Sequence, residues 1–314
     1  MHKKQNFFVQ DFESVNEQDY LKRKNIPHIF HTFKWMRIIK ETLNVNCKIA
    51  LLKENNIIVA SIPFVSYRNL IKGQCALPLQ FSGYYGSIFA DKEDLKIKIF
   101  SKFLEYCKNF NFFTQIPEVN SINGCQFFSG YSIYKIKLKD NSSAEEQILA
   151  SANKRMREYT KKDIKYKFKS FTGGKELLKK FYILYLQNMK ELGTPPLQKK
   201  FFKKIIESFP EATKIILIKD KKKICSGMFL LKVSKSELFT PVICTPRAYQ
   251  VNQSSHFVYL QATKEAQKWG CSVMNFGRSI DGSGPALFKK RYGLKVTPLL
   301  IYSPCNNWTV TDPK

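Results

Sequence analysis

The order of predicted secondary structure repeats along this chain of 314 residues, and that repetition limits the fold more than any other feature. Each half has apolar residues at helical spacing, then alternating strand-like runs, then another helix and a further strand. The predicted helices cover 30–43, 91–110, 145–161, 175–190, 198–209 and 254–269. The predicted strands cover 47–53, 57–67, 74–81, 112–116, 131–138, 213–219, 224–233, 237–244, 271–275 and 294–302. This pattern predicts an α+β protein built from two domains of the same architecture.

The domain boundary is expected where a polar segment interrupts the pattern. Asp140-Asn141-Ser142-Ser143 is rich in helix-capping residues, and Glu145-Glu146 places acidic side chains in the first turn of the next helix. We therefore predict domains over 1–141 and 142–314. Each is expected to be a mostly antiparallel mixed sheet flanked by helices.

A loop between the last two predicted strands concentrates glycines and cations. Asn275-Phe276-Gly277-Arg278-Ser279 is followed by Gly282-Ser283-Gly284-Pro285 and by Phe288-Lys289-Lys290-Arg291-Tyr292-Gly293. Such a cluster is typical of a simple turn or of a loop that binds an anion. Gly277 and Gly284 would let the backbone approach a ligand closely, and the guanidinium fork of Arg278 suits a phosphate or carboxylate or, alternatively, a structural salt bridge.

This loop resembles the C-terminal signature of the FemAB-like acyltransferases, and further landmarks of that family occur in the expected order. The matching segments are His31–Trp35, Ile58–Phe64, Ser82–Gly86, Asn153–Arg157 and Leu192–Pro195. The resemblance implies two tandem GNAT-like domains. It also implies transfer of an acyl or aminoacyl group to an amine of a cell-envelope or polysaccharide precursor, with Lys289 as a site lysine.

Further candidate site residues come from three predicted segments. Asn252, His256 and Tyr259 lie on one side of the helix that begins at 254, and either bind an acceptor and supply a general base or belong to the core. The helix that opens the second domain offers Arg155, and the glycine turn of the first domain offers Tyr84 and Tyr85. The predicted catalytic residues are thus Lys289, His256 and Tyr259. The predicted substrate-binding residues are Arg278, Arg155, Asn252, Tyr84, Tyr85, Gly277 and Gly284.

Metal and covalent chemistry have no sequence signal. The four histidines and eight cysteines show no metal-ligand spacing, and no G-x-S-x-G segment is present. We expect no metal and no tightly bound cofactor. An acyl-CoA-like donor or an aminoacyl-tRNA would serve as cosubstrate, and both donors stay open.

The net charge of +27 favours anionic partners. Besides the acyl donor and an amine-bearing anionic precursor, tRNA and a membrane surface are candidate partners, the latter by peripheral association. Because no signal peptide or membrane-spanning run is visible, a cytoplasmic protein is expected. The basic segment 154–169 supports an alternative, a noncatalytic nucleic-acid-binding protein.

Overall fold

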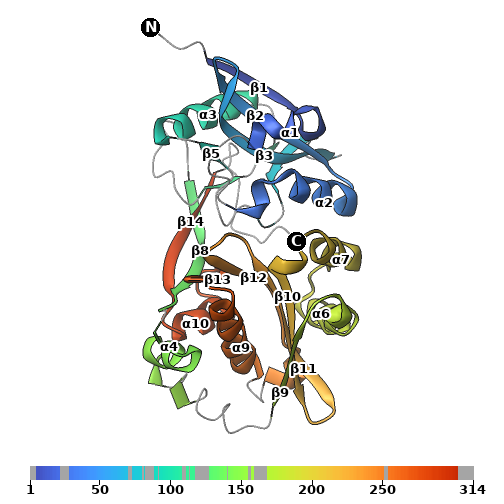
Figure 1. Cartoon of the computed structure of the whole chain (residues 1–314), viewed down its shortest axis with the longest axis vertical. Coiled ribbons are helices and arrows are strands. Elements are labelled where there is room, and N and C mark those ends of the chain that lie inside the picture. The colour runs from blue at the N-terminus through green and yellow to red at the C-terminus, as the bar shows by residue number, and fades with distance from the viewer. Residues whose placement is uncertain are drawn as a thin grey trace. The chain divides into compact units, whose positions relative to one another are not determined.

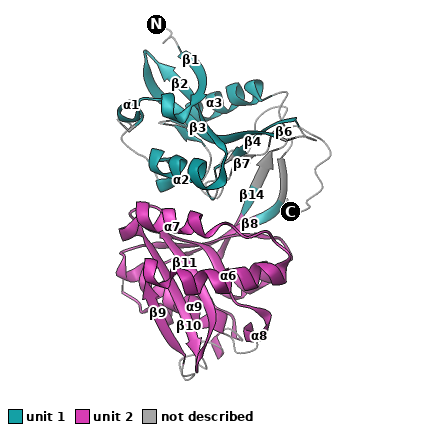
Figure 2. Cartoon of the chain, turned by 90° about the vertical axis from the view of Figure 1, so that its right-hand side faces the viewer, with its two compact units in different colours: residues 1–131, 298–311 teal, residues 132–297, 312–314 magenta. Residues whose placement is uncertain are grey.

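The structure, a computed structural model, divides into two compact units. Residues 1–131 and 298–311 form unit 1, and residues 132–297 and 312–314 form unit 2 (Figure 2). The described residues are 5–21, 28–69, 73–79, 81, 88–90, 92–107, 111–112, 114–116, 127–139, 141–154, 157–158, 168–250 and 254–302.

Unit 1 contains a mostly antiparallel sheet in the order β1-β2-β3-β4-β6, with β5 paired to β3. Its strands are β1 (Gln5–Asp11), β2 (Asn46–Glu54), β3 (Ile57–Asn69), β4 (Gly73–Pro78), β5 (Phe89–Ala90) and β6 (Asn111–Phe112). Only the β4–β6 pair among these is parallel. Strand β1 was not expected from the sequence; Phe7 and Val9 pack on the core, whereas Phe8 is 43% exposed.

Two longer helices of unit 1 follow from local sequence. Helix α2 (Phe33–Leu43) begins after Thr32, whose side chain accepts a hydrogen bond from the Trp35 N–H, and ends at Asn44 in the left-handed conformation. Trp35 is fully buried, as helical periodicity predicts. Helix α3 (Glu93–Tyr106) packs a face containing Ile99 and Phe103 against the sheet. Shorter helical segments are η1 (Phe12–Ser14), α1 (Glu17–Leu21) and η2 (Ile29–His31).

The second sheet has the strand order β7-β14-β8-β13-β12-β11-β10-β9. Strands β9 to β12 pair antiparallel, whereas β12 and β13 are parallel. The strands are β7 (Thr114–Ile116), β8 (Phe127–Lys137), β9 (Lys169–Gly173), β10 (Thr213–Asp220), β11 (Lys223–Lys232), β12 (Glu237–Cys244), β13 (Val273–Ile280) and β14 (Lys295–Tyr302). The expected α+β architecture of mostly antiparallel mixed sheets flanked by helices is confirmed.

Helices cover both faces of the sheet in unit 2 (Figure 1). On one face, α6 and α7 meet β11 through Phe181, Phe202 and Phe229. On the other face, α4, α9 and α10 enclose a core that includes Met228 and Val258. The helices are α4 (Ala144–Ser151), η4 (Lys175–Leu177), α6 (Leu178–Leu192), α7 (Lys199–Ser208), η5 (Pro210–Ala212), α8 (Arg247–Gln250), α9 (Ser254–Lys268) and α10 (Gly284–Arg291).

Two boundaries differ from the sequence-based expectation. Helix α4 begins with the predicted capping box of Ser143 and Glu146, but it ends at Ser151 because Ala152 is extended (φ −75°, ψ 151°). A helix continuous over 145–161 is therefore wrong. The compact units change at 131/132, earlier than the boundary expected at 141/142, and residues 298–311 return to unit 1. The domain division at 141/142 itself stays a prediction.

Candidate functional site

The parallel pairing of β12 with β13 stops after three positions in unit 2. Glu237, Leu238 and Phe239 pair with 273–275, and the Thr240 hydroxyl then donates to the Asn275 carbonyl at 3.3 Å. In the described part of the two strands, no pairing between them is recorded beyond this point. Both strands nevertheless continue, β12 to Cys244 and β13 to Ile280.

A bulge in β12 lies where the pairing stops. Phe229 pairs with Val242 and Leu231 with Phe239, so Thr240 and Pro241 together face the single residue Leu230. A bulge bends and twists its strand, and proline has no N–H to donate to a ladder. The bulge and Pro241 thus lie at the point where β12 and β13 stop pairing, and no ladder joins the described residues of the two strands beyond it.

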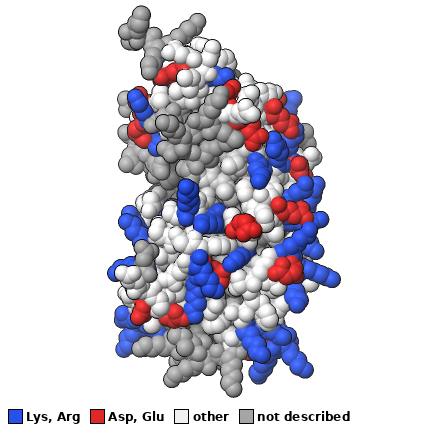
Figure 3. Space-filling model, in the orientation of Figure 1, with Lys and Arg blue, Asp and Glu red and all other residues white. Residues whose placement is uncertain are grey.

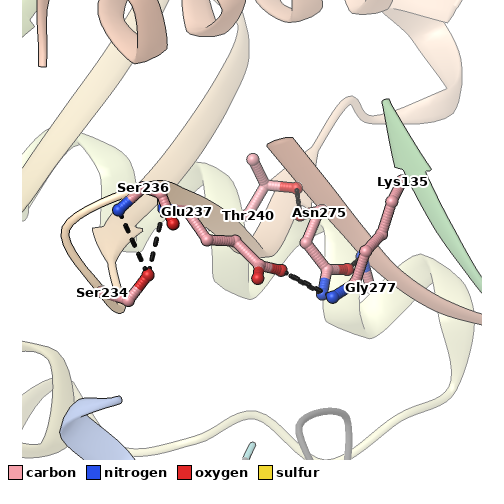
Figure 4. A network of polar contacts seen from close by, with 7 residues as sticks. All are labelled: Lys135, Ser234, Ser236, Glu237, Thr240, Asn275 and Gly277. Carbon is pink, nitrogen blue, oxygen red and sulfur yellow. Dashed lines mark hydrogen bonds and ion pairs between the residues drawn. The ribbon is translucent and has the colours of Figure 1, made fainter. Parts of the chain in front are cut away.

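A buried polar network fixes the backbone of β13 at Gly277, inside the strand and beside this gap (Figure 4). Asn275 is fully buried; its Oδ1 accepts from the Gly277 N–H at 2.8 Å, and its Nδ2 donates to Glu237 Oε1 at 3.1 Å. Glu237 also forms an ion pair with Lys135 at 2.9 Å. Gly277 has φ +72°, a conformation that side-chain-bearing residues rarely adopt, so glycine is required here.

Lys289 on α10 contacts β13 at Gly277 and Arg278. Its Nζ donates to the carbonyls of Gly277 at 3.3 Å and Arg278 at 3.1 Å, and lies 5.3 Å from the centre of the Tyr134 ring. Lys289 is only 7% exposed, and burial lowers its pKa to about 7. The backbone of β13 holds the buried amine of Lys289, and the catalytic role expected for this residue stays a prediction.

Tyr134 on β8 is a site residue that sequence reasoning missed. Its side chain is fully buried, and its hydroxyl has no hydrogen-bond partner among the described residues. Burial raises its pKa, with a smaller contribution from Asp281. The alternating pattern of 131–138 predicts a strand that contains Tyr134, but no local signal places this residue next to Lys289.

His256 and Tyr259 lie together in an aromatic cluster between α9 and α10. The Nδ1 atom of His256 and the Tyr292 hydroxyl are 2.8 Å apart, and burial, assisted by Arg291, lowers the pKa of His256 to about 4. The Tyr259 ring contacts Phe276 and Phe288 at centroid distances of 4.9 and 5.4 Å, and burial raises its pKa. At neutral pH, His256 is therefore an uncharged imidazole.

The remaining predicted site residues divide into two groups. Arg278 is half-buried on β13, and Gly284 is the exposed first residue of α10 with open space where a Cβ would lie. The close approach of a ligand to the backbone predicted at Gly277 and Gly284 stays a prediction. Arg155, Asn252, Tyr84 and Tyr85 lie outside the described residues, as does most of 154–169. Their roles and the nucleic-acid hypothesis stay predictions.

Among the described residues, no three His, Cys, Asp or Glu side chains are grouped so that they could hold a metal ion. The described helices also include none with the length and apolarity needed to span a bilayer.

Similarity to known proteins is found by comparison of structures and not by comparison of sequences. No protein-family model matches the sequence. No curated protein sequence matches it either. Among solved structures, a crystal structure of FemX is similar at TM-score 0.63 and 10% identity, covering 93% of this chain and 96% of FemX. A tandem GNAT protein from the clavulanic acid biosynthesis pathway has TM-score 0.54 and 7% identity, covering 97% of this chain and 100% of its own.

A third similar structure is the C-terminal domain of a putative lysylphosphatidylglycerol synthetase from Agrobacterium fabrum. Its TM-score is 0.56 at 11% identity, with 79% of this chain and 81% of that chain covered. At such low identities the comparisons show the fold, and the two tandem domains expected from the repeated order of elements are confirmed at that level. The chain has a FemX-like tandem GNAT fold.

Proposed function

We propose that the protein is an N-acyltransferase whose donor site lies between β12 and β13 of unit 2. The observation that carries this proposal is the early end of the parallel ladder beside Gly277 and Lys289. Backbone groups that lose their ladder partner need other hydrogen bonds. An extended donor with amide groups can supply them in the manner of an added strand. The structural similarity to FemX and to a tandem GNAT protein supports the same reaction class.

The proposed reaction joins the donor's acyl carbon to the nitrogen of an amine. The neutral amine attacks the carbonyl carbon, the bond to the sulfur or oxygen of the carrier breaks, and the carrier leaves with a proton. The transition state develops negative charge on the carbonyl oxygen, which fixed donors in a dry site stabilise strongly. Lys289 holds the carbonyls of Gly277 and Arg278 and so orients this part of β13 toward the gap.

Arg278 is the proposed contact for an anionic group on the substrate, because it follows Gly277 on β13 and carries a permanent charge. The donor is either an acyl-CoA-like thioester or an aminoacyl-tRNA. The acceptor is an amine of an anionic cell-envelope or polysaccharide precursor, bound without a metal.

Mass spectrometry of ligands that copurify with the protein tests the donor directly. We expect a CoA species or a tRNA, and labelled transfer from that donor to an amine should then be measured for wild type, Lys289→Ala, Arg278→Ala and the control Lys290→Ala. Losing the charge-assisted contact of Arg278 should lower kcat/KM by a factor of about 10–100, corresponding to ~1.5–3 kcal/mol. Losing Lys289 should also lower it, because the carbonyls of Gly277 and Arg278 lose the amine that holds them. The exposed Lys290 should be dispensable. Wild-type turnover in both the Lys289 and Arg278 variants would refute the proposed site.

A further inference from the structure

The outward face of α6 combines apolar and basic side chains in one stripe. Phe181, Leu184 and Tyr185 of this helix are buried against the sheet. On the opposite face, Ile183 is 60% exposed and Leu186 is 39% exposed. Lys179 and Lys190 are exposed and complete a spacing of i, i+4, i+7 and i+11, which places all four side chains on one face of the helix. We call Lys179, Ile183, Leu186 and Lys190 the α6 stripe.

The surroundings of the α6 stripe are strongly basic. Helix α7 packs on the same face of the sheet and beside α6, and its lysines at 199, 200 and 203 are exposed. Residues 175–208 contain eight lysines and three glutamates, a net charge of +5. Figure 3 shows Lys and Arg side chains along the right-hand edge of the view, where Figure 1 places α6 and α7, with acidic side chains between them.

The three glutamates of this region have partners within the protein. Glu207 pairs with Lys175 at 2.8 Å, Glu191 accepts from the Arg247 N–H at 2.8 Å, and Glu176 accepts from the Gly174 N–H at 2.8 Å. Intramolecular contacts therefore engage the few negative groups. The positive charge of α6 and α7 stays in excess around two exposed aliphatic side chains.

We propose that the α6 stripe docks onto the surface of an anionic lipid bilayer. Exposed aliphatic side chains between lysines suit the interface, because the apolar groups enter the acyl boundary while lysine stems extend toward lipid phosphates. Each lysine near an anionic leaflet contributes about a fivefold gain in binding. A polyanion such as RNA would use the charges but would gain little from Ile183 and Leu186. This distinction favours the membrane as the occupant.

Co-sedimentation with vesicles tests the proposal. The wild type should bind vesicles of phosphatidylcholine mixed with phosphatidylglycerol and should bind pure phosphatidylcholine weakly. Ile183→Ser with Leu186→Ser should reduce binding roughly tenfold by removing the inserted groups. Lys179→Glu with Lys190→Glu should reduce it roughly 25-fold or more.

Two matched double variants serve as controls. Ile57→Ser with Ile97→Ser alters exposed isoleucines of unit 1, and Lys98→Glu with Lys222→Glu changes the net charge as much as the stripe reversal does. Both should stay within about twofold of wild type, because they leave the four residues of the α6 stripe unchanged. Melting curves identify any variant that fails to fold. If one of the two stripe variants does not fold, vesicle binding by the other tests the proposal.

Three results would overturn the proposal: no preference for anionic vesicles, equal losses in the control and stripe variants, or RNA binding that depends on the stripe in a protein that ignores vesicles. The proposal does not rest on acyl transfer, since vesicle binding is measured without a donor.

Discussion

Burial of Lys289 makes it the residue whose ionisation is most closely tied to folding. Its pKa falls from the ordinary 10.5 to about 7 in the folded protein because burial disfavours the ammonium ion. Between these pH values the unfolded chain binds more protons, so the free energy of unfolding rises with pH from about 7 to 10.5. Each tenfold change in proton affinity is worth about 1.4 kcal/mol.

Replacing Lys289 by methionine should abolish this pH dependence. Urea denaturation at pH 7 and pH 10 should show wild type gaining a few kcal/mol relative to Lys289→Met, whereas Lys290→Met, an exposed neighbour on α10, should follow wild type. Parallel pH profiles for wild type and Lys289→Met would show that the amine is solvated in the folded protein.

His256 has a consequence of the same sign at acidic pH. Its pKa is lowered from 6.5 to about 4, so the unfolded chain takes up a proton first as the pH falls. The stability that the neutral imidazole provides is complete above about pH 6.5 and is lost as the pH falls to 4, on the order of 3 kcal/mol in total.

The variant His256→Gln isolates this effect from the titration of carboxylates. The wild type should be the more stable protein at pH 7.5, and its advantage should shrink by pH 4.5. Chemical denaturation at the two values provides the measurement. An advantage that stays constant would mean that His256 titrates with an ordinary pKa in the folded chain.

At the scale of single residues, the sequence predicted the neighbourhood better than the orientation of its side chains. The glycine and lysine motif correctly places Gly277, Arg278 and Lys289 together, since a strand, a turn and a helix close in sequence must meet. It could not show that Lys289 points into the core or that Tyr134 lies beside it. Those facts depend on the pairing of β8 within the sheet, which no local pattern encodes.

The candidate site depends on strand β13 at Gly277. Gly277 and Gly282 both have positive φ, at +72° and +79°, but only the carbonyl of Gly277 accepts a hydrogen bond from Lys289. Alanine in this conformation costs about 1–2 kcal/mol at either position. The two variants are therefore matched in backbone strain and differ in their relation to the site.

Gly277→Ala should lower kcat/KM for transfer by at least about tenfold, because a shift of the backbone at Gly277 moves the two carbonyls that Lys289 holds. Gly282→Ala should lose similar stability and keep its activity. Thermal melting and transfer assays on both variants provide the comparison. Equal activity in the two would show that the conformation at Gly277 serves folding alone.

The start of α4 depends on neighbouring residues and was predicted, whereas elements defined by distant pairing were not. Ser143 begins α4 because its side chain caps the first turn, a contact within three residues; α2 begins after Thr32, later than the start expected at residue 30. Strand β1 escaped prediction because it exists through its register with β2, from Gln5 opposite Glu54 to Asp11 opposite Lys48. A short run with few branched residues has little strand preference until that partner is present.

For the whole molecule, the repeated order of elements was sufficient to predict the two-domain α+β fold. The net charge, by contrast, bears on the stability of that fold. Fifty-two basic and 25 acidic residues leave an excess of +27. Repulsion among like charges opposes the compact state, and at physiological salt it is screened between charges more than about 8–10 Å apart. Exposed ion pairs such as Lys102 with Glu105 also weaken in salt, but each is worth only ~0–1 kcal/mol. With so large an excess of cations, the relief of repulsion should prevail.

We therefore expect the melting temperature to rise as sodium chloride is added from low to physiological concentration. Neutralising exposed lysines should reproduce that rise without salt, so Lys98→Gln with Lys222→Gln should melt higher than wild type at low ionic strength. The control is Lys214→Gln. Lys214 forms an ion pair with the buried Glu265 at 2.7 Å, so the variant leaves a buried carboxylate less compensated. This variant should melt at a lower temperature than wild type at every salt concentration. A melting temperature that falls with added salt would show that ion pairs, rather than repulsion among the excess cations, dominate the electrostatics of this fold.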